Sequence, residues 1–186
     1  MEKKILRKFY FTRRKKKYFE INKFFFLPLK KLIIKNFKKK KLYISLYYPN
    51  SFELNVFRIF ELEYFKKVRF LLPIIEDDKS MSFYDWKKND ILYVNKFGIL
   101  EPTKSQQKTP NVILVPLLAY DKKKNRLGYG GGYYDRFFKK YLQTHKNILI
   151  VGVAFSFQKH HNLPANSNDF KLDYIITEKG ILKWKF

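Results

Sequence analysis

The sequence contains no cysteine, and this absence excludes several kinds of site at once. Of the 186 residues none is Cys, three are His and seven are Gly. Disulfides, a thiolate nucleophile and a cysteine-ligated metal are therefore unavailable. The absence of cysteine is typical of a protein from a reducing compartment.

Long apolar runs are also missing. The most apolar stretch near the N-terminus, "FFFLPL" at 24–29, is too short to span a bilayer and is interrupted by Pro28. We find no secretory or membrane segment. We therefore expect a cytoplasmic protein with no membrane partner.

Acidic residues are scarce, with 16 Asp and Glu against 40 Lys and Arg, which gives a net charge of +24. One interpretation is a protein that binds nucleic-acid phosphates. The other is mutational drift, because Lys is enriched together with Phe, Tyr, Ile and Asn, which AT-rich codons encode. The lysines are dispersed along the whole chain, which favours drift and no specific nucleic-acid partner. A hydrophobic fraction of 46% excludes a disordered chain, and the length predicts one domain over residues 1–186.

The order of apolar patterns predicts an α/β fold. Helical spacing over the first 40 residues predicts two helices with a break near Pro28, and residues 53–64 show helical spacing again. Alternation over residues 41–48 predicts a strand. Continuous apolar runs, typical of strands covered on both faces, follow at 68–73, 111–116, 147–155 and 172–177. We expect a single three-layer domain, a mostly parallel sheet flanked by helices on both faces.

Four of the seven glycines lie in one stretch, "RLGYGGGYYDRFF" at 126–138. The stretch follows the apolar run 111–116 and opens a predicted helix over 133–142. It could be a connection that needs positive φ angles, or a cradle of backbone amides for phosphate at a helix N-terminus. Its place after a strand favours the cradle. Asp135, in the first helical turn, either complements the helix dipole or ligates Mg²⁺.

Taken with other stretches, this motif resembles the 5-formyltetrahydrofolate cyclo-ligase family, also called methenyltetrahydrofolate synthetases. "RLGYGGGYYD" matches the family signature R-L-G-x-G-x-G-Y-Y-D at each fixed position, and "KKILR" at 3–7 matches its N-terminal K-x-x-L-R. "MSFYDW", "FGILEP", "VPLLAYD", "GVAFSFQ", "LPANSND" and "LDYIIT" follow in the family's order. Around Asp169 the acid that the family often carries shortly before this position is absent from "ANSN".

The resemblance implies an ATP- and Mg²⁺-dependent enzyme that converts 5-formyltetrahydrofolate to 5,10-methenyltetrahydrofolate, ADP and phosphate. The formyl oxygen attacks the γ-phosphate, N10 of the folate closes the ring, and phosphate leaves. Because substrate atoms perform each attack, the lack of a cysteine or Ser–His nucleophile is no obstacle. We expect a monomer whose partner is a small molecule.

The resemblance also implies the site, residue by residue. Catalytic roles fall to Arg126 and Tyr134, and metal binding to Asp135 and Asp169. Nucleotide binding is implied for Lys3, Lys4, Ile5, Leu6, Arg7, Arg126, Leu127, Gly128, Tyr129, Gly130, Gly131, Gly132, Tyr133 and Tyr134. Folate binding is implied for Tyr48, Glu53, Tyr129, Gly130, Gly131, Gly132 and Tyr133.

Simpler interpretations exist for several of these residues. Lys3 and Arg7 could be solvated residues of an amphipathic helix, and Glu53 could be an acid at a helix start. Adjacent His160 and His161 point apart on an extended chain, so solvation is favoured over metal binding. The aromatic residues Phe83, Tyr84 and Trp86 could stack on a pterin, but we expect them in the core.

Two other function classes remain open from the residues. A sugar-phosphate isomerase or acyl-CoA transferase has a comparable sheet, but it would carry a carboxylate nucleophile or base in a different motif, which we do not find. An RNA-binding protein would concentrate its Lys and Arg on one surface and bind with a steep salt dependence.

Overall fold

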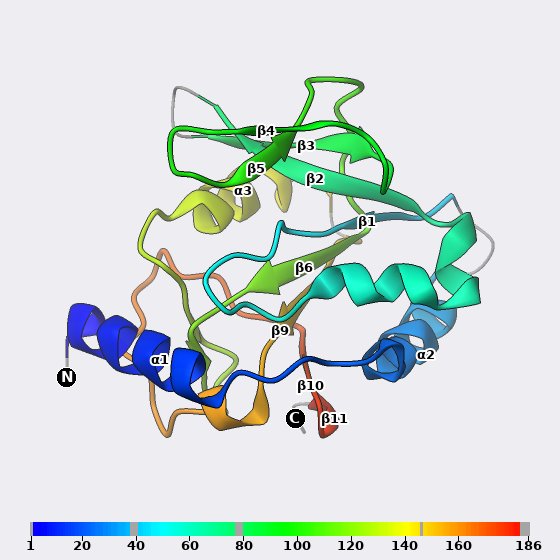
Figure 1. Ribbon diagram of the computed structural model, residues 1–186. Coiled ribbons are helices and arrows are strands. Elements are labelled where there is room, and N and C mark those ends of the chain that lie inside the picture. Colours follow the sequence, from blue (N-terminus) through cyan, green and yellow to red (C-terminus); the bar gives the residue numbers. More distant parts are fainter. Residues whose placement is uncertain (1, 38–40, 77–79, 146, 183–186) are drawn as a thin grey trace.

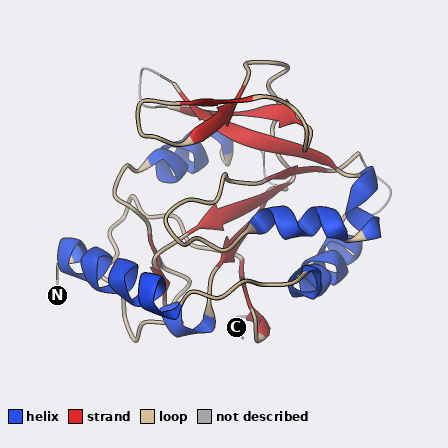
Figure 2. Cartoon of the chain, in the orientation of Figure 1, coloured by secondary structure: helices blue, strands red, loops and turns tan. Residues whose placement is uncertain are grey.

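The centre of the protein is a seven-stranded sheet, seen in a computed structural model that describes residues 2–37, 41–76, 80–145 and 147–182 (Figures 1 and 2). The strand order is β11–β10–β9–β6–β1–β2–β3. Neighbours from β10 to β2 pair in parallel, whereas β11 and β3 pair antiparallel at the two edges. The strands are β1 (Tyr43–Ser45), β2 (Arg69–Ile75), β3 (Met81–Trp86), β6 (Val112–Pro116), β9 (Leu149–Val153), β10 (Tyr174–Thr177) and β11 (Gly180–Leu182). The predicted mostly parallel sheet is confirmed.

Helices cover both faces of the sheet because each strand sends apolar side chains to alternate sides. In β6, Val112 and Leu114 belong to one core, and Ile113 and Val115 belong to the other. The first core is covered by α2 and three short 3₁₀ helices, and the second by α3. These helices are η1 (Lys23–Phe26), α2 (Leu27–Asn36), η2 (Val56–Glu61), η3 (Glu63–Lys67) and α3 (Tyr133–Tyr141). The predicted α/β class is confirmed.

The N-terminal helix α1 (Lys3–Lys17) packs beside a small hairpin rather than on a face of the sheet (Figure 1). Leu6 and Tyr10, one turn apart, join an apolar cluster with residues of β7 (Ala119–Tyr120) and β8 (Arg126–Leu127). This hairpin lies within the segment that the sequence indicates as a loop, because two-residue strands are too short to show alternation. None of the described helices is long and apolar enough to cross a bilayer.

Three sequence predictions differ from the structure in detail. The chain leaves helical conformation between Lys17 and Lys23, and Pro28 lies in the first turn of α2, where its missing N–H is not needed. The helix expected over 53–64 is two 3₁₀ helices, whose buried Val56 and Ile59 follow a spacing of three. The strand expected over 41–48 is regular only in β1, because the chain turns away toward the cavity described below.

The segment between β2 and β6 was not predicted in detail. β3 returns antiparallel to β2, and the chain then forms a separate two-stranded ribbon of β4 (Leu92–Val94) and β5 (Leu100–Pro102). The last short helix, η4 (Ser156–Gln158), follows β9. Phe83 and Trp86 of β3 are buried in the two cores, and Tyr84 is buried as well, so these aromatics are core residues as expected.

The chain reverses its direction of progress across the sheet between β1 and β6. Strands β2 and β3 lie on one side of β1 in the sheet, whereas β6, β9 and β10 lie on its other side. In open α/β sheets such a switch point leaves a crevice at the carboxyl ends of the strands, where ligands bind. The fold therefore places a crevice beyond Ser45 and Pro116.

Two adjacent isoleucines of α2 test the packing. Ile33 is fully buried in the first core, whereas Ile34 is 52% exposed. We expect Ile33→Ala to lower the free energy of unfolding by about 2–5 kcal/mol, because it leaves a cavity, and Ile34→Ala to lower it by less than about 1 kcal/mol. Urea unfolding followed by circular dichroism measures both, and equal losses would contradict the packing described.

Candidate active site

A cavity of about 710 Å³ lies at the carboxyl ends of the central strands. It is lined by residues from α1, the loops after β1 and β8, the first turn of α3, the β4–β5 ribbon and the segment before β10. Among the predicted site residues it is lined by Lys3, Arg7, Tyr48, Glu53, Arg126, Leu127, Gly128, Tyr129, Gly130, Gly131, Gly132, Tyr133, Tyr134, Asp135 and Asp169. Segments more than 160 residues apart in sequence, such as Lys3 and Asp169, thus meet in one place.

The glycine loop needs its glycines both for backbone angles and for close approach. Gly130 and Gly132 have φ angles of +106° and +67°, which non-glycine residues rarely adopt. A Cβ on Gly130 would lie 3.3 Å from the Arg7 guanidinium carbon, and one on Gly131 would overlap the Tyr133 ring. The need for positive φ angles is therefore confirmed, and the loop lines the cavity, while its role as a phosphate cradle stays a prediction.

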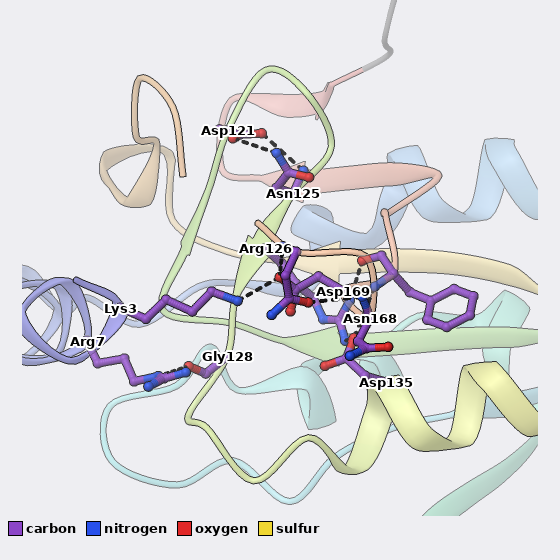
Figure 3. Close-up of polar contacts among 11 residues, drawn as sticks. Lys3, Arg7, Asp121, Asn125, Arg126, Gly128, Asp135, Asn168 and Asp169 are labelled. Carbon is purple, nitrogen blue, oxygen red and sulfur yellow. Dashed lines mark hydrogen bonds and ion pairs between the residues drawn. The ribbon is translucent and has the colours of Figure 1, made fainter. Parts of the chain in front are cut away.

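The first turns of α1 present two cations to the cavity. Lys3 and Arg7, four residues apart, lie on one helix face. The Lys3 ammonium lies 2.6 Å from Asp169 Oδ2, and Arg7 Nε donates a hydrogen bond of 2.9 Å to the carbonyl of Gly128 (Figure 3). The structure therefore places both residues at the cavity rather than on a solvated face.

The intervening residues of the "KKILR" stretch point elsewhere, as helical geometry requires. Lys4 and Ile5 are exposed, and Leu6 is buried against the β7–β8 hairpin. None of the three lines the cavity. The contacts of Lys4, Ile5 and Leu6 with nucleotide stay predictions. Such contacts would need their backbone atoms or a ligand that extends beyond the cavity.

Arg126 is a buried cation between the glycine loop and α3. Its side chain is 5% exposed; one terminal nitrogen lies 2.6 Å from Asp135 Oδ1, and the other donates to the carbonyl of Phe170 at 2.5 Å (Figure 3). The backbone N–H of Phe170 donates to the same Asp135 oxygen at 3.1 Å. Arg126 thus fixes the start of α3 to the segment that carries Asp169.

The two predicted metal ligands line the same cavity although 34 positions separate them. Burial raises the pKa of Asp169, but the hydrogen bonds from Lys3 and from the Asn166 backbone N–H outweigh it and hold the pKa below its ordinary value. No group of three or more His, Asp or Glu that could hold a metal occurs among the described residues. Two carboxylates nevertheless suit Mg²⁺, which is usually held by one or two protein carboxylates together with substrate phosphates.

The wall that carries the glycine loop is anchored by a buried carboxylate in the turn between β7 and β8. Asp121 is fully buried and accepts hydrogen bonds from the backbone N–H groups of Lys123, Asn125 and Leu163, and from the Asn125 side chain, at 2.8–3.0 Å. Figure 3 shows the contact between Asp121 and Asn125. The contact with Leu163 ties the hairpin to the segment that leads to Asp169.

Glu53 lines the same cavity from the loop after β1. Its carboxylate accepts hydrogen bonds from the Tyr129 hydroxyl and, at 2.9 Å, from the backbone N–H of Asn50. Burial raises the pKa of Glu53, although these two hydrogen bonds and the charge of Arg14 oppose the rise. Tyr48 lines the cavity nearby, with its ring 5.5 Å from that of Phe57. Glu53 therefore belongs to a built polar site and is not merely an acid at a helix start.

Tyr134 presents the one buried hydroxyl of the cavity lining that has no hydrogen-bond partner among the described residues. Burial, followed by the charge of Glu53, raises the pKa of Tyr134 well above its ordinary value. The hydroxyl therefore stays protonated and can donate a hydrogen bond to a ligand.

An apolar wall of the cavity was missed from the sequence. It is formed by Pro73, Ile75, Met81, Phe97, Ile99 and Leu100 from β2, β3 and the β4–β5 ribbon. Glu101 fixes this ribbon, because its carboxylate accepts from the backbone N–H of Ile75 at 2.9 Å and from the Asn95 amide at 2.7 Å. The "FGILEP" stretch was the available signal, since it contains Phe97, Ile99, Leu100 and Glu101.

The histidine pair lies outside this cavity. His160 is half-buried, with its ring nitrogen 2.8 Å from the Tyr10 hydroxyl, and His161 is exposed. The predicted exposure to solvent is therefore confirmed for His161. It is wrong for His160, which packs against the helix α1.

Comparison with known proteins decides the family. The profile of the 5-formyltetrahydrofolate cyclo-ligase family matches residues 12–178. The chain belongs to the 5-formyltetrahydrofolate cyclo-ligase family. This finding confirms the predicted resemblance and, because the family is one of ligases, the predicted enzyme class.

Individual relatives agree with the family assignment. A probable 5-formyltetrahydrofolate cyclo-ligase of Schizosaccharomyces pombe is 31% identical over 53% of this chain and 55% of its own length, so the match spans about half of that relative. The 5-formyltetrahydrofolate cyclo-ligase of Mycoplasma genitalium is 32% identical over 72% of this chain and 70% of its own length. The solution structure of the Aquifex aeolicus 5,10-methenyltetrahydrofolate synthetase aligns with a TM-score of 0.73 and 31% identity, covering 100% of this chain and 94% of that one.

Two glycines of the loop form a matched test of its geometry. Gly132 has a positive φ, and a Cβ there would lie 2.8 Å from an Arg136 nitrogen, whereas Gly128 has neither constraint. We expect Gly132→Ala to lower the free energy of unfolding by about 1–2 kcal/mol, because alanine is strained in this conformation, and Gly128→Ala to change it by less than about 0.5 kcal/mol. Urea unfolding measures both, and equal effects would contradict the described backbone.

Proposed function

We propose that this chain, acting as a single domain over residues 1–186, converts 5-formyltetrahydrofolate and ATP to 5,10-methenyltetrahydrofolate, ADP and phosphate with Mg²⁺ as cofactor. The observation that carries the proposal is the convergence of the family motifs on one cavity. The cations Lys3, Arg7 and Arg126, the glycine loop, both aspartates and Glu53 all line it.

The cationic part of the cavity suits the nucleotide. Lys3, Arg7 and Arg126 supply positive charge, and the loop ends at the N-terminus of α3, where free backbone N–H groups and the helix dipole favour phosphate. Asp135 and Asp169 would hold Mg²⁺, which when bound neutralises charge on the nucleotide phosphates. Lys3 and Arg126 already neutralise these carboxylates, so ligand binding must redistribute contacts that exist in the protein alone.

The remainder of the cavity suits a reduced folate. A pterin ring is flat and presents N–H donors along one edge, which a carboxylate such as Glu53 can accept. The apolar wall of β2, β3 and the β4–β5 ribbon supplies surface for the ring, and Tyr48 and Tyr129 supply aromatic contacts. The site thus offers complementary chemistry for both substrates.

The reaction needs positioning and charge stabilisation from the protein. The formyl oxygen bonds to the γ-phosphorus as the bond to ADP breaks, and N10 then bonds to the formyl carbon as the C–O bond to phosphate breaks and the N10 proton is lost. Arg126, fixed by Asp135 and Phe170, contributes positive charge beside the glycine loop. Tyr134 contributes a protonated hydroxyl as a hydrogen-bond donor to developing negative charge.

Other expectations accompany the proposal. We infer a cytoplasmic monomer whose partner is a small molecule, with no specific nucleic-acid partner and no membrane partner. These inferences stay predictions, and gel filtration with light scattering would measure the oligomeric state.

Substitution of one aspartate tests the proposal directly. We expect the wild-type protein to form methenyltetrahydrofolate, followed by its absorbance, only when 5-formyltetrahydrofolate and Mg-ATP are both present. Asp135→Asn should lower kcat by about 10²–10³-fold, because it removes a charged ligand at the reacting phosphates. Asp90→Asn, at an exposed acid in the turn after β3, is the matched control and should leave kcat unchanged.

Two outcomes would contradict the proposal. Folded wild-type protein that forms no ATP-dependent product would exclude the reaction, and binding of RNA with a steep salt dependence would then favour the alternative class. Full activity in Asp135→Asn, with circular dichroism equal to wild type, would exclude Asp135 from metal binding.

A further inference from the structure

Arg14 is an unusual residue to find inside this protein. Its side chain is 1% exposed, although eight other Lys and Arg residues of α1 give this helix ample charge without it. Taking a guanidinium out of water is costly unless its hydrogen bonds and charge are compensated. The contacts of the Arg14 guanidinium therefore indicate what its burial contributes to the structure.

The guanidinium of Arg14 joins three segments. One terminal nitrogen donates to the carbonyl of Ser51 at 2.8 Å, and the other donates more weakly to the carbonyl of Leu117 at 3.4 Å. Its central carbon lies 5.5 Å from the centre of the Tyr129 ring, a cation–π distance. Arg14 thus connects α1, the loop after β1, the end of β6 and the glycine loop.

Two of these contacts, those with Ser51 and Tyr129, lead to Glu53. Ser51 and Phe52 have φ angles of +50° and +64°, an unfavourable conformation for non-glycine residues that the surroundings must hold in place. Glu53 follows directly, and its carboxylate accepts the hydroxyl of Tyr129, the ring that Arg14 faces. Arg14 makes no ion pair with a carboxylate among the described residues, and Glu53 is the carboxylate whose ionisation its charge favours.

We propose that Arg14 is a positioning residue for the folate half of the cavity: it holds the Ser51 turn and the Tyr129 ring so that the Glu53 carboxylate is presented to the substrate. This inference rests on the proposed function. Arg14 does not line the cavity, so it acts through Ser51, Tyr129 and Glu53 and not by touching the substrate.

The charge of Arg14 should also be visible in the pH dependence. Burial raises the pKa of Glu53, and Arg14 opposes that rise together with the hydrogen bonds from Tyr129 and Asn50. Among the described residues, the charge of Glu53 raises the pKa of the tyrosines Tyr47, Tyr129 and Tyr134, which burial also raises, so these stay protonated at neutral pH. Loss of Arg14 leaves burial less opposed, so the Glu53 carboxylate takes up its proton at a higher pH.

The experiment compares Arg14→Met, Arg14→Gln and Arg14→Lys with Arg13→Met. Arg13 is the neighbouring arginine, is not fully buried and packs on Phe9, outside the cavity. Titration calorimetry measures the Kd for 5-formyltetrahydrofolate without nucleotide, and the Kd for Mg-ATP without folate. Steady-state kinetics then gives the pH profile of kcat/KM for the folate.

We expect Arg14→Met to raise the Kd for 5-formyltetrahydrofolate about tenfold or more, and the Kd for Mg-ATP by less than about twofold. The acid limb of kcat/KM should move to higher pH in Arg14→Met and Arg14→Gln. It should stay in place in Arg14→Lys, which keeps the charge. Arg13→Met should match wild type in every measurement.

Several results would overturn the inference. They are equal losses of affinity for both ligands in Arg14→Met, an unchanged folate Kd, or an acid limb that does not move when the charge is removed. If all three Arg14 variants fail to fold by circular dichroism, Arg14 is a determinant of folding and not a positioning residue. A wild-type protein that binds folate but forms no product would refute the proposed function and leave the binding comparison in force.

Discussion

The structure depends on a constraint that parallel sheets impose at the carboxyl ends of their strands. The loops that leave this edge have irregular backbones, yet they are packed together, and their buried N–H and C=O groups need partners. In this protein buried charged side chains provide them. Arg14 donates to the carbonyls of Ser51 and Leu117, Arg126 donates to the carbonyl of Phe170, and Asp121 accepts from the N–H of Leu163. These side chains join the segments that surround the cavity.

The same arrangement leaves the cavity with nearly balanced charge before any ligand binds. Lys3 is paired with Asp169 and Arg126 with Asp135, while Arg7 donates to the Gly128 carbonyl. In a protein with a net charge of +24, two of the acids that line the cavity thus each face a specific base. The large excess of Lys and Arg lies elsewhere, which agrees with drift on the surface around a retained site.

The sequence predicted the parts of the fold that have a strong local signal. Four apolar runs are the strands β2, β6, β9 and β10, and the glycine motif ends at the helix α3, as expected. The short β7–β8 hairpin and the β4–β5 ribbon gave no periodic signal, because two or three residues cannot show one. The helix expected over 53–64 became 3₁₀, since an apolar spacing of three residues fits either helix type.

The site residues likewise divide into those that the sequence could predict and those that it could not. Motif residues that line the cavity could be named in advance because each fixed position of a short motif is visible in the sequence. Lys4, Ile5 and Leu6 were included with them because a linear motif does not show which helix face turns inward. Arg14 could not be distinguished from the neighbouring lysines and arginines of "RRKKK", because only tertiary packing buries it. The apolar wall was missed because Pro73, Ile75 and Met81 are ordinary strand residues outside any motif.

The burial of Asp121 makes its contacts less sensitive to ionic strength than those of the Lys3–Asp169 pair. Its carboxylate is held by four N–H groups at close range inside the protein, whereas the Lys3–Asp169 pair, with side chains 28% and 20% exposed, lies partly in solvent. Dissolved ions screen partly exposed charges far more than buried ones. Raising the salt concentration therefore loosens the attachment of α1 to the Asp169 segment while the β7–β8 hairpin keeps its hold on that segment. The two sides of one cavity wall thus respond differently to the solvent around this highly charged protein.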